Sequence, residues 1–174
     1  MSWDEKCLPV ELILADVDGV LTDGGVVFDN QGIETKRFDI RDGLGIRLWQ
    51  RAGYRFGLIT GRNSHIVKLR SIELDIDIVR QGAEDKLPVV REILDTLGLA
   101  PERAAFIGDD LPDLPAVRHV GLGVAVQTAC EELRAAADYV TRRPGGHGAV
   151  RETIELVLKA QQRWSDLMQL YEGS

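Results

Sequence analysis

The chain has 174 residues and a formal net charge of −7, with 44% hydrophobic and 28% charged residues. This length and balance predict one folded domain over residues 1–174, and the acidic excess argues against a nucleic-acid partner, whose phosphates need a basic face. Two cysteines are too few for a disulfide framework, the polar N-terminus does not resemble a signal peptide, and no run approaches the ~20 apolar residues of a membrane span, so we expect a cytoplasmic protein that does not enter a membrane.

Apolar runs alternate along the chain with stretches of helical periodicity. In chain order we predict strand 12–15, helix 44–52, strand 56–59, helix 64–72, strand 76–79, helix 86–97, strand 104–107, strand 123–126, helix 131–137, strand 139–140 and helix 149–170. The runs at 12–15, 56–59 and 104–107 are unbroken, which is typical of strands buried on both faces of a parallel sheet. The alternation predicts βαβ units and a doubly wound α/β sheet flanked by helices.

One segment interrupts this alternation directly after the first strand. Residues 26–28 and 33–38 flank a polar turn at 29–32, a pattern that predicts a β-hairpin. At the other end of the chain, apolar side chains within 167–171 predict a helix that docks, with another subunit as one candidate partner.

The three stronger strands end in polar residues, at Asp16, Thr60 and Asp109. Ligands of open α/β sheets bind at the carboxyl ends of the strands. Converging carboxylates repel one another unless a cation neutralises them, and Mg²⁺ is a hard cation that prefers such oxygens. We therefore predict a Mg²⁺ site at this edge, which could also bind a substrate phosphate.

The segment Asp16-Val17-Asp18-Gly19 has a spacing that suits phosphoryl transfer. Asp16, at the strand end, can attack phosphorus and form an aspartyl-phosphate. Asp18 lies in the turn, where it can protonate the leaving oxygen and later deprotonate water, and Gly19 permits the tight turn. A pair of solvated loop aspartates is the alternative, which the neighbouring polar strand ends make the weaker one.

Thr60-Gly61-Arg62 and Lys86 are candidate phosphate ligands. The Thr60 hydroxyl, backbone N–H groups and the following helix N-terminus make an anion seat, with a plain helix N-cap as the alternative. Lys86 opposes the dipole of the helix that it begins, so it needs another purpose. Holding a phosphate is one such purpose, and a solvated surface lysine is the alternative.

Asp109, Asp110 and Asp113 crowd three carboxylates into five positions. A metal ligand with neighbours that orient it explains this density, and an acidic helix start explains it equally well.

Cations are also needed near an anionic substrate, and three arginines are candidates that would otherwise be ordinary surface residues: Arg41, Arg47 and Arg70. Residues 39–43 form a plausible active-site loop between the hairpin and the next helix. The three histidines are scattered without metal-ligand spacing, and we interpret them as structural.

These motifs resemble those of the haloacid dehalogenase superfamily of phosphatases, over about the whole chain. Their finer details are similar to the family of 3-deoxy-D-manno-octulosonate 8-phosphate (KDO 8-phosphate) phosphatases. The motifs that carry the resemblance are Asp16-Val-Asp-Gly-Val-Leu-Thr-Asp-Gly, Arg41-Asp-Gly-x-Gly-Ile, Thr60-Gly-Arg, Lys86, Gly108-Asp-Asp-x-x-Asp113 and Gly145-Gly-x-Gly-Ala-Val-Arg-Glu.

The resemblance implies a Rossmann-like core without a large cap domain, a Mg²⁺ cofactor, and a homotetramer whose hairpins meet at its centre. It implies that Asp16 is the nucleophile and a metal ligand, that Asp18 is the general acid and base with its carbonyl on the metal, and that Asp109 is the third protein ligand. Asp110 and Asp113 would orient the metal ligand, while Thr60 and Lys86 would hold the phosphate.

The resemblance also assigns substrate contacts to particular positions of this chain. They are Asp18, Asp39, Ile40, Arg41, Asp42, Gly43, Arg47, Gly61, Arg62, Arg70 and Lys86. Arg62 favours an eight-carbon sugar acid, because relatives that act on nine-carbon acids tend to have an acidic residue there. The tail after Glu152 is less similar to the family.

The implied activity is hydrolysis of KDO 8-phosphate to KDO and phosphate, a step in making lipopolysaccharide. One alternative is the same chemistry on a nine-carbon sugar acid 9-phosphate. Others are a phospho-accepting receiver module and a non-catalytic domain that only oligomerises. A receiver needs no base two residues after its acceptor, whereas Asp18 stands there, and the chain has no P-loop motif.

Overall fold

The computed structural model describes residues 2–172. Its strands are β1 (Leu12–Ala15), β2 (Val27–Phe28), β3 (Glu34–Thr35), β4 (Arg55–Ile59), β5 (Ile78–Arg80), β6 (Ala104–Gly108), β7 (Leu122–Ala125) and β8 (Tyr139–Val140). Its helices are α1 (Trp3–Cys7), α2 (Ile40–Arg51), α3 (His65–Glu73), α4 (Lys86–Leu97), α5 (Leu114–His119), α6 (Glu131–Ala136), α7 (Ala149–Ala160) and α8 (Trp164–Met168), with 3-10 turns η1 (Pro101–Arg103) and η2 (Leu111–Asp113). Within residues 2–172, no helix combines the length and apolar character needed to cross a bilayer.

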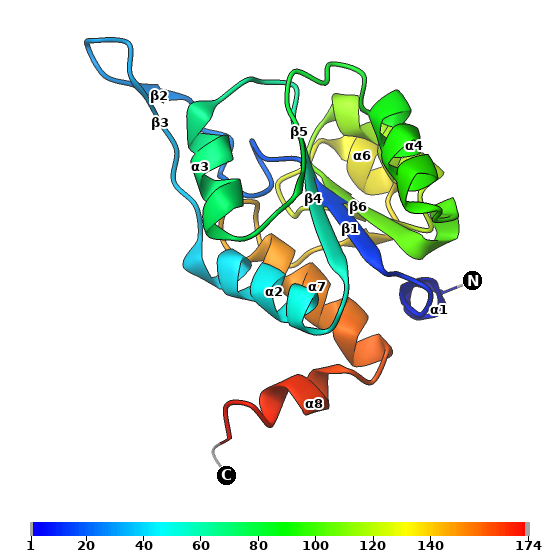
Figure 1. The fold of residues 1–174 in the computed structure, drawn as a ribbon. Helices are drawn as coiled ribbons and strands as arrows, with labels where there is room; N and C mark the ends of the chain where they lie inside the picture. Colours follow the sequence, from blue (N-terminus) through cyan, green and yellow to red (C-terminus); the bar gives the residue numbers. More distant parts are fainter. Residues whose placement is uncertain (1, 173–174) are drawn as a thin grey trace.

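The predicted sheet is confirmed: six parallel strands in the order β5-β4-β1-β6-β7-β8. The chain moves outward from β1 to β4 and β5, then returns to β6 beside β1 and moves the other way. Since parallel crossovers are right-handed, this reversal places helices on both faces. Helices α2 and α7 pack together on one side, and α4 and α6 lie on the other (Figure 1). The strand order reverses at β1, where the ends of β1, β4 and β6 form a ligand crevice.

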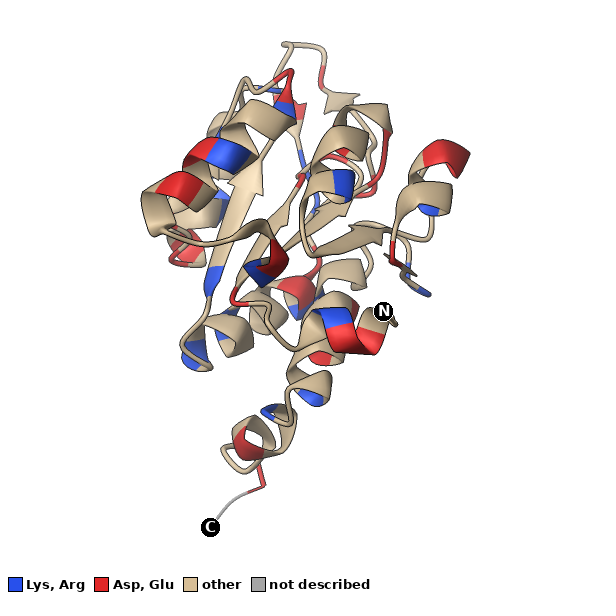
Figure 2. Cartoon of the chain, turned by 90° about the vertical axis from the view of Figure 1, so that its right-hand side faces the viewer, with Lys and Arg blue, Asp and Glu red and all other residues tan. Residues whose placement is uncertain are grey.

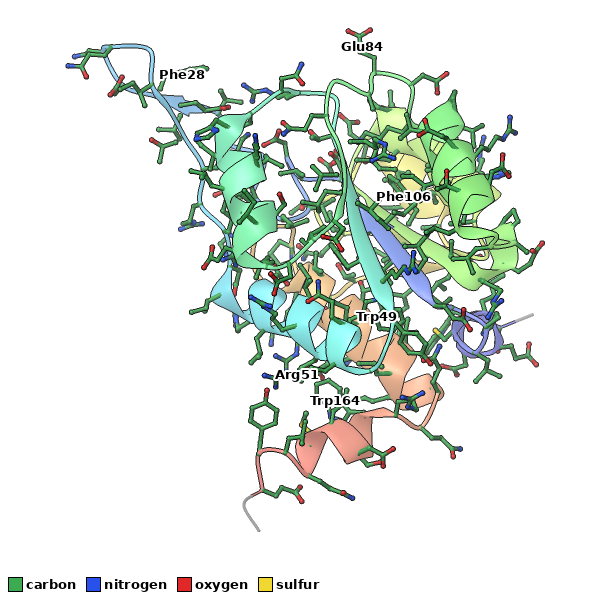
Figure 3. The ribbon with its side chains drawn as sticks, in the orientation of Figure 1. Phe28, Trp49, Arg51, Glu84, Phe106 and Trp164 are labelled. Carbon is green, nitrogen blue, oxygen red and sulfur yellow. The ribbon has the colours of Figure 1, made fainter. Side chains whose placement is uncertain are left out.

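The core sits on both faces of the central strands. All four residues of β1 are buried, as are all five of β6, because unbroken apolar runs can fill both faces only under helices. Trp49 and Phe106 are the largest fully buried side chains (Figure 3). The Trp49 indole N–H donates to the Arg55 carbonyl at 2.7 Å, which ties α2 to the start of β4.

The structure corrects the prediction of one long helix over 149–170. Helix α7 ends at Ala160, and Gln162 adopts a left-handed φ of 58° before α8 begins. The Gln161 amide donates to carbonyls near the chain start, including those of Cys7 and Val10, so tertiary bonds compete with further helix. Leu167 then docks on this same chain, although Leu170 stays exposed.

Two further helices, α1 and α5, are absent from the prediction. They are five and six residues long, too short for a clear apolar period. Helix α2 also begins four residues earlier than predicted, because Asp39 caps it by accepting a hydrogen bond from the Arg41 N–H at 2.7 Å.

The predicted hairpin is present as the antiparallel pair β2–β3, inserted after β1. It projects from the body of the molecule, with Phe28 directed into the surroundings (Figure 3). Its large apolar side chains are all more than half exposed: Val26, Val27, Phe28 and Ile33. Elsewhere acidic and basic residues are interspersed along the helices that Figure 2 presents to the viewer.

Candidate active site

The carboxyl edge of the sheet brings the polar strand ends together, as the sequence predicts. Asp16 follows β1, Thr60 follows β4 and Asp109 follows β6, and the parallel register aligns these strand ends. A cavity of about 440 Å³ opens here, within the range of roughly 300–1,000 Å³ typical of ligand sites. Its lining consists of Asp16, Asp18, Thr60, Gly61, Arg62, Ala83, Glu84, Lys86, Asp109, Asp110, Pro112 and Asp113.

Lys86 lies inside this cluster and not on the surface, so the alternative of a solvated lysine is wrong. Its residue exposure is 2%, and its Nζ donates to Asp113 Oδ1 at 2.5 Å and lies 2.7 Å from Asp16 Oδ2. Burial alone would lower the pKa of the ammonium, but the two carboxylates outweigh it and raise that pKa. Lys86 is therefore a fixed positive charge in the lining of the cavity.

Asp113 holds the acidic segment in place. Its Oδ1 accepts from Lys86, and its Oδ2 accepts from the Asp109 N–H at 2.9 Å. Asp110 caps the turn η2 through the Leu111 N–H and is exposed. The three carboxylates therefore differ in role. Asp113 and Asp110 shape the turn, and the turn presents Asp109 to the cavity.

The local electrostatics of this cluster favour a cation. Burial and the nearby Asp16 and Asp113 carboxylates raise the pKa of Asp109 to about 7. Burial and Asp113 likewise raise the pKa of Asp16 despite the opposing pull of Lys86. One oxygen from each of Asp16, Asp109 and Asp113 lies within 4.8 Å of the others. Carboxylates crowded this closely repel one another, and a hard divalent cation offsets that repulsion, so the residues fit Mg²⁺.

The turn after β1 carries Asp18 and depends on a glycine. Gly19 has a left-handed φ of 89°, and a Cβ there would collide with the Asp109 carboxylate. The Asp18 Oδ1 atom is ion-paired with Lys36, whereas its Oδ2 atom is buried and has no hydrogen-bond partner within residues 2–172. An orphaned buried oxygen beside the cluster is a second sign that a ligand belongs there.

Sequence reasoning missed the residues that surround this turn from elsewhere in the chain. Lys36 and Glu34 come from the root of the hairpin, and Glu34 Oε1 lies 2.8 Å from Arg62 Nη2. On the other side, the Gly146 N–H donates to the Val20 carbonyl at 2.8 Å. The glycine-rich motif at 145–148 was the available signal for that second contact, because close backbone approach requires glycine.

Thr60-Gly61-Arg62 lines the cavity between β4 and α3. The Thr60 hydroxyl accepts weakly from the Arg62 N–H at 3.4 Å, and Thr60 itself is buried. The cap residue of α3 is Ser64 and not Thr60, so a plain N-cap does not explain the threonine.

The substrate contacts assigned to residues 39–43 fall on the first turn of α2, beside the cluster and not in it. Asp39 caps the helix and pairs with the exposed Arg41 at 2.7 Å, while Ile40 is 83% exposed. Asp42 is buried and accepts from the Gly148 and Arg151 N–H groups at 3.3 and 2.7 Å. Gly43 faces the Arg70 guanidinium.

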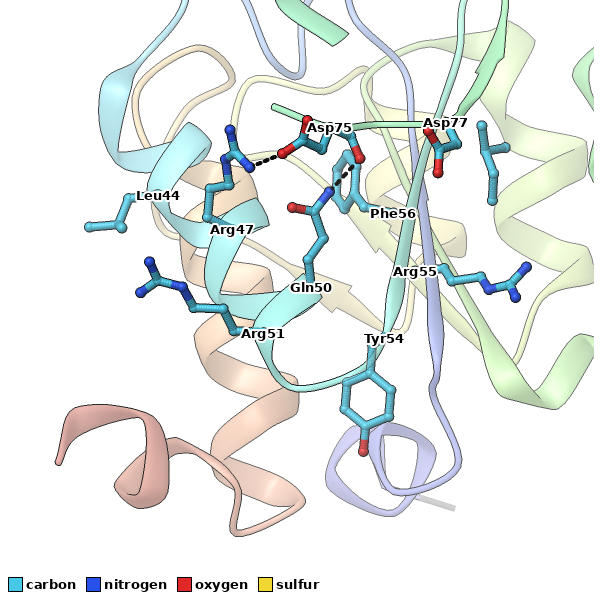
Figure 4. Close-up of a pocket in the computed structure, with 10 residues that line it drawn as sticks. Leu44, Arg47, Gln50, Arg51, Tyr54, Arg55, Phe56, Asp75 and Asp77 are labelled. Atoms are coloured by element: carbon cyan, nitrogen blue, oxygen red, sulfur yellow. Dashed lines mark hydrogen bonds and ion pairs between the residues drawn. The ribbon is translucent and has the colours of Figure 1, made fainter. Parts of the chain in front are cut away.

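Two further arginines lie farther from the cluster within one chain. Arg47 pairs with Asp75 in a groove of about 700 Å³ (Figure 4). That groove includes Arg55 at the start of β4, the opposite end from Thr60, so it is separate from the candidate site. Arg70 lies over the Phe38 ring and pairs with Glu73 at 2.8 Å.

Comparisons with known proteins agree with this geometry. The haloacid dehalogenase-like hydrolases match residues 63–152. A 3-deoxy-D-manno-octulosonate 8-phosphate phosphatase of Yersinia pestis is 44% identical over 159 residues, which are 91% of this chain and 85% of that protein. Its counterpart in Escherichia coli K12 is 45% identical over 156 residues, 90% and 83% of the two chains.

Solved structures extend the likeness to the fold. The phosphatase of that name from Moraxella catarrhalis, crystallised with magnesium, phosphate and KDO, superposes with a TM-score of 0.96 at 42% identity, over 98% of both chains. The cobalt-bound phosphatase from Haemophilus influenzae superposes with a TM-score of 0.87 at 36% identity, over 90% of this chain and 92% of that one.

Proposed function

Because the chain belongs to the KDO 8-phosphate phosphatase family of haloacid dehalogenase-like hydrolases, we propose that it is a Mg²⁺-dependent phosphomonoesterase that releases KDO and phosphate from KDO 8-phosphate. The observation that carries the proposal is one cluster: Asp16 and Asp109 at adjacent strand ends, a buried Lys86 between carboxylates, and Asp18 two residues after Asp16.

The proposed reaction proceeds in two steps on this chain's own residues. A carboxylate oxygen of Asp16 attacks phosphorus, the ester P–O bond breaks, and Asp18 gives its proton to the departing sugar oxygen. Water then attacks the aspartyl-phosphate, Asp18 takes a proton from that water, and phosphate leaves with Asp16 regenerated. Lys86 and Thr60 hold the phosphoryl oxygens, whose negative charge the fixed ammonium stabilises.

Mg²⁺ would be held by the carboxylates of Asp16 and Asp109 and by the backbone carbonyl of Asp18. When bound, such an ion offsets phosphate charge and orients the ester. Asp113 is a poorer candidate ligand, because its side chain is only 1% exposed, against 13% for Asp16, and its two oxygens hold Lys86 and the Asp109 N–H. We assign Asp113 and Asp110 to orienting the segment that presents Asp109.

Selection of a sugar acid would fall to the cations around the cavity. Arg62 lines it directly, and Gly61 leaves room beside it. Arg70, Arg41 and Arg47 do not line it within one chain, so they would meet substrate only through movement or across a contact between subunits.

We also propose that the chain forms a homotetramer through its hairpin. Four large apolar side chains on so small a hairpin, all over half exposed, are more than a monomeric surface explains. Sedimentation equilibrium on the intact chain and on a Phe28→Lys variant would test this, and an unchanged mass would contradict it. A cytoplasmic location is supported by Cys7 and Cys130, which are both free thiols.

The experiment that tests the activity is phosphate release with Mg²⁺ across a substrate panel. KDO 8-phosphate, a nine-carbon 9-phosphate analogue and simple sugar phosphates would be compared, with Asp16→Asn run beside the unaltered protein. Preference for KDO 8-phosphate that disappears in the variant supports both chemistry and substrate. Preference for the nine-carbon acid would overturn the role of Arg62. A stable aspartyl-phosphate without turnover would favour a receiver module, and inertness toward every phosphate would refute the phosphatase.

A further inference from the structure

Two residues at the root of the hairpin, Glu34 and Lys36, reach the candidate site, and the proposed reaction does not use them. Lys36 Nζ is ion-paired with Asp18 Oδ1 and lies 3.4 Å from Glu34 Oε1. That same Glu34 oxygen lies 2.8 Å from Arg62 Nη2. Four side chains of alternating charge therefore run from Asp18 to Arg62, which both line the cavity.

Lys36 is unusual because its side chain is only 1% exposed. Lysine is almost never fully buried unless it is paired, and a buried ammonium pays a desolvation penalty that only well-placed carboxylates repay. Its neighbour Arg37 shows the common alternative, with a side chain 68% exposed. Burial of this cation, on a hairpin whose large apolar side chains Val26, Val27, Phe28 and Ile33 are exposed, indicates that Lys36 serves the groups it contacts.

The ion pair with Lys36 engages only one of the two carboxylate oxygens of Asp18. Lys36 holds Oδ1, and Oδ2 remains the oxygen without a hydrogen-bond partner within residues 2–172. A carboxylate held by one oxygen keeps its orientation and presents the other oxygen to a ligand. Glu34 Oε1 is ion-paired with one Nη atom of Arg62, whose side chain is 41% exposed, and this buried oxygen makes no hydrogen bond within residues 2–172.

We propose that Lys36 and Glu34 are positioning residues of this phosphatase. Lys36 fixes the Asp18 carboxylate toward the leaving oxygen, and Glu34 fixes the Arg62 guanidinium toward the sugar acid. The inference rests on the proposed function, and neither residue touches the reacting atoms. Since groups displaced by about 1 Å can lose two orders of magnitude in rate, both contacts have measurable consequences.

Three substrates separate the two roles. KDO 8-phosphate has an alcohol leaving group and a sugar acid, glycerol phosphate has only the alcohol, and 4-nitrophenyl phosphate has a phenolate that leaves without a proton. Lys36→Met should lower kcat/KM by roughly 10- to 100-fold for both alcohol esters and by much less for the aryl ester. Glu34→Gln should raise KM for KDO 8-phosphate alone. Lys36→Arg should restore part of the loss.

The matched control is Arg37→Met, which removes a cation from the adjacent position of the same strand end and should leave all three substrates unchanged. Sedimentation of each variant checks that assembly is intact. Equal losses on all three substrates, or no loss with Lys36→Met, would overturn the proposal. If Lys36→Met fails to fold, Lys36→Gln supplies the same comparison.

The activity of the wild-type protein on the three substrates distinguishes failure of this proposal from failure of the proposed function. A wild type that hydrolyses glycerol phosphate but not KDO 8-phosphate would refute the proposed substrate. The contrast between alcohol and aryl esters would then still decide the role of Lys36. A wild type inactive on all three would refute the phosphatase itself.

Discussion

The contact between Asp42 and the start of α7 gives a pH-dependent prediction. Asp42 is 2% exposed, and its two oxygens accept the Arg151 and Gly148 N–H groups. Burial is the largest influence and raises the pKa of Asp42 to about 6, against the lowering effect of the Arg151 hydrogen bond. Relative to the ordinary pKa of 3.8, this shift means that ionised Asp42 lowers the free energy of unfolding by about 3 kcal/mol at neutral pH, at about 1.4 kcal/mol per tenfold change in proton affinity.

The sign follows from proton binding in the two states. Between pH 3.8 and about 6 the folded chain binds more protons at Asp42 than the unfolded chain does. The contribution of Asp42 to the free energy of unfolding therefore falls as the pH rises through this window. When the pH is lowered from 7.5 to 4.5, we expect the free energy of unfolding of the wild type to rise by about 2 kcal/mol relative to that of Asp42→Asn.

Urea unfolding followed by circular dichroism, in EDTA to keep cations from the acidic cluster, measures this difference. Other titrating groups cancel in the comparison when they lie apart from Asp42. Asp42→Ala serves as the companion variant. It loses both acceptors and leaves buried N–H groups unpaired, so it should be less stable than Asp42→Asn by about 1–3 kcal/mol. A wild-type difference from Asp42→Asn that is flat across this pH range would refute the reasoning.

Four further outcomes are expected. Asp16→Asn should lower turnover by roughly 10³-fold or more with its circular dichroism spectrum unchanged, and residual activity near wild type would exclude Asp16 as nucleophile. Lys86→Met should lower the free energy of unfolding in urea by about 3–5 kcal/mol, because it leaves two buried carboxylates without their cation. The same variant should release no phosphate. Gly146→Ala should cost about 2 kcal/mol or more, since its φ is 72° and a Cβ would meet the Asp23 amide; an unchanged urea midpoint would contradict that contact. EDTA should abolish turnover and added Mg²⁺ restore it, with a higher melting temperature in Mg²⁺ than in EDTA.

Much of the site could be predicted because short-range pattern and sheet topology determine it together. An apolar run that stops at Asp16, Thr60 or Asp109 marks the end of a buried strand, and parallel strands bring such ends to one edge. Lys86 was identifiable because a lysine at a helix start opposes the dipole. These signals lie within a few residues of the positions that they predict.

The contacts that escaped prediction join distant segments of the chain. Lys36 neither precedes an apolar run nor begins a helix. It contacts Asp18, 18 positions earlier in the sequence, only because the hairpin folds back toward the turn. Asp42 looks like a loop residue in sequence, yet its partners stand 106 and 109 positions later. The break at Gln162 likewise follows from bonds to the chain start that no local periodicity contains.

These long-range contacts converge on the turn that carries Asp18. The hairpin holds the turn through Lys36, and the segment before α7 holds it through the bond from Gly146 to Val20. Asp42 fixes the start of α7, only two residues after Gly146 at Gly148. A turn at a strand end has few neighbours of its own, so its rigidity must come from such segments. The hairpin and the glycine-rich motif are therefore best understood as parts of the active site, because they fix the turn that carries Asp18 beyond the end of β1.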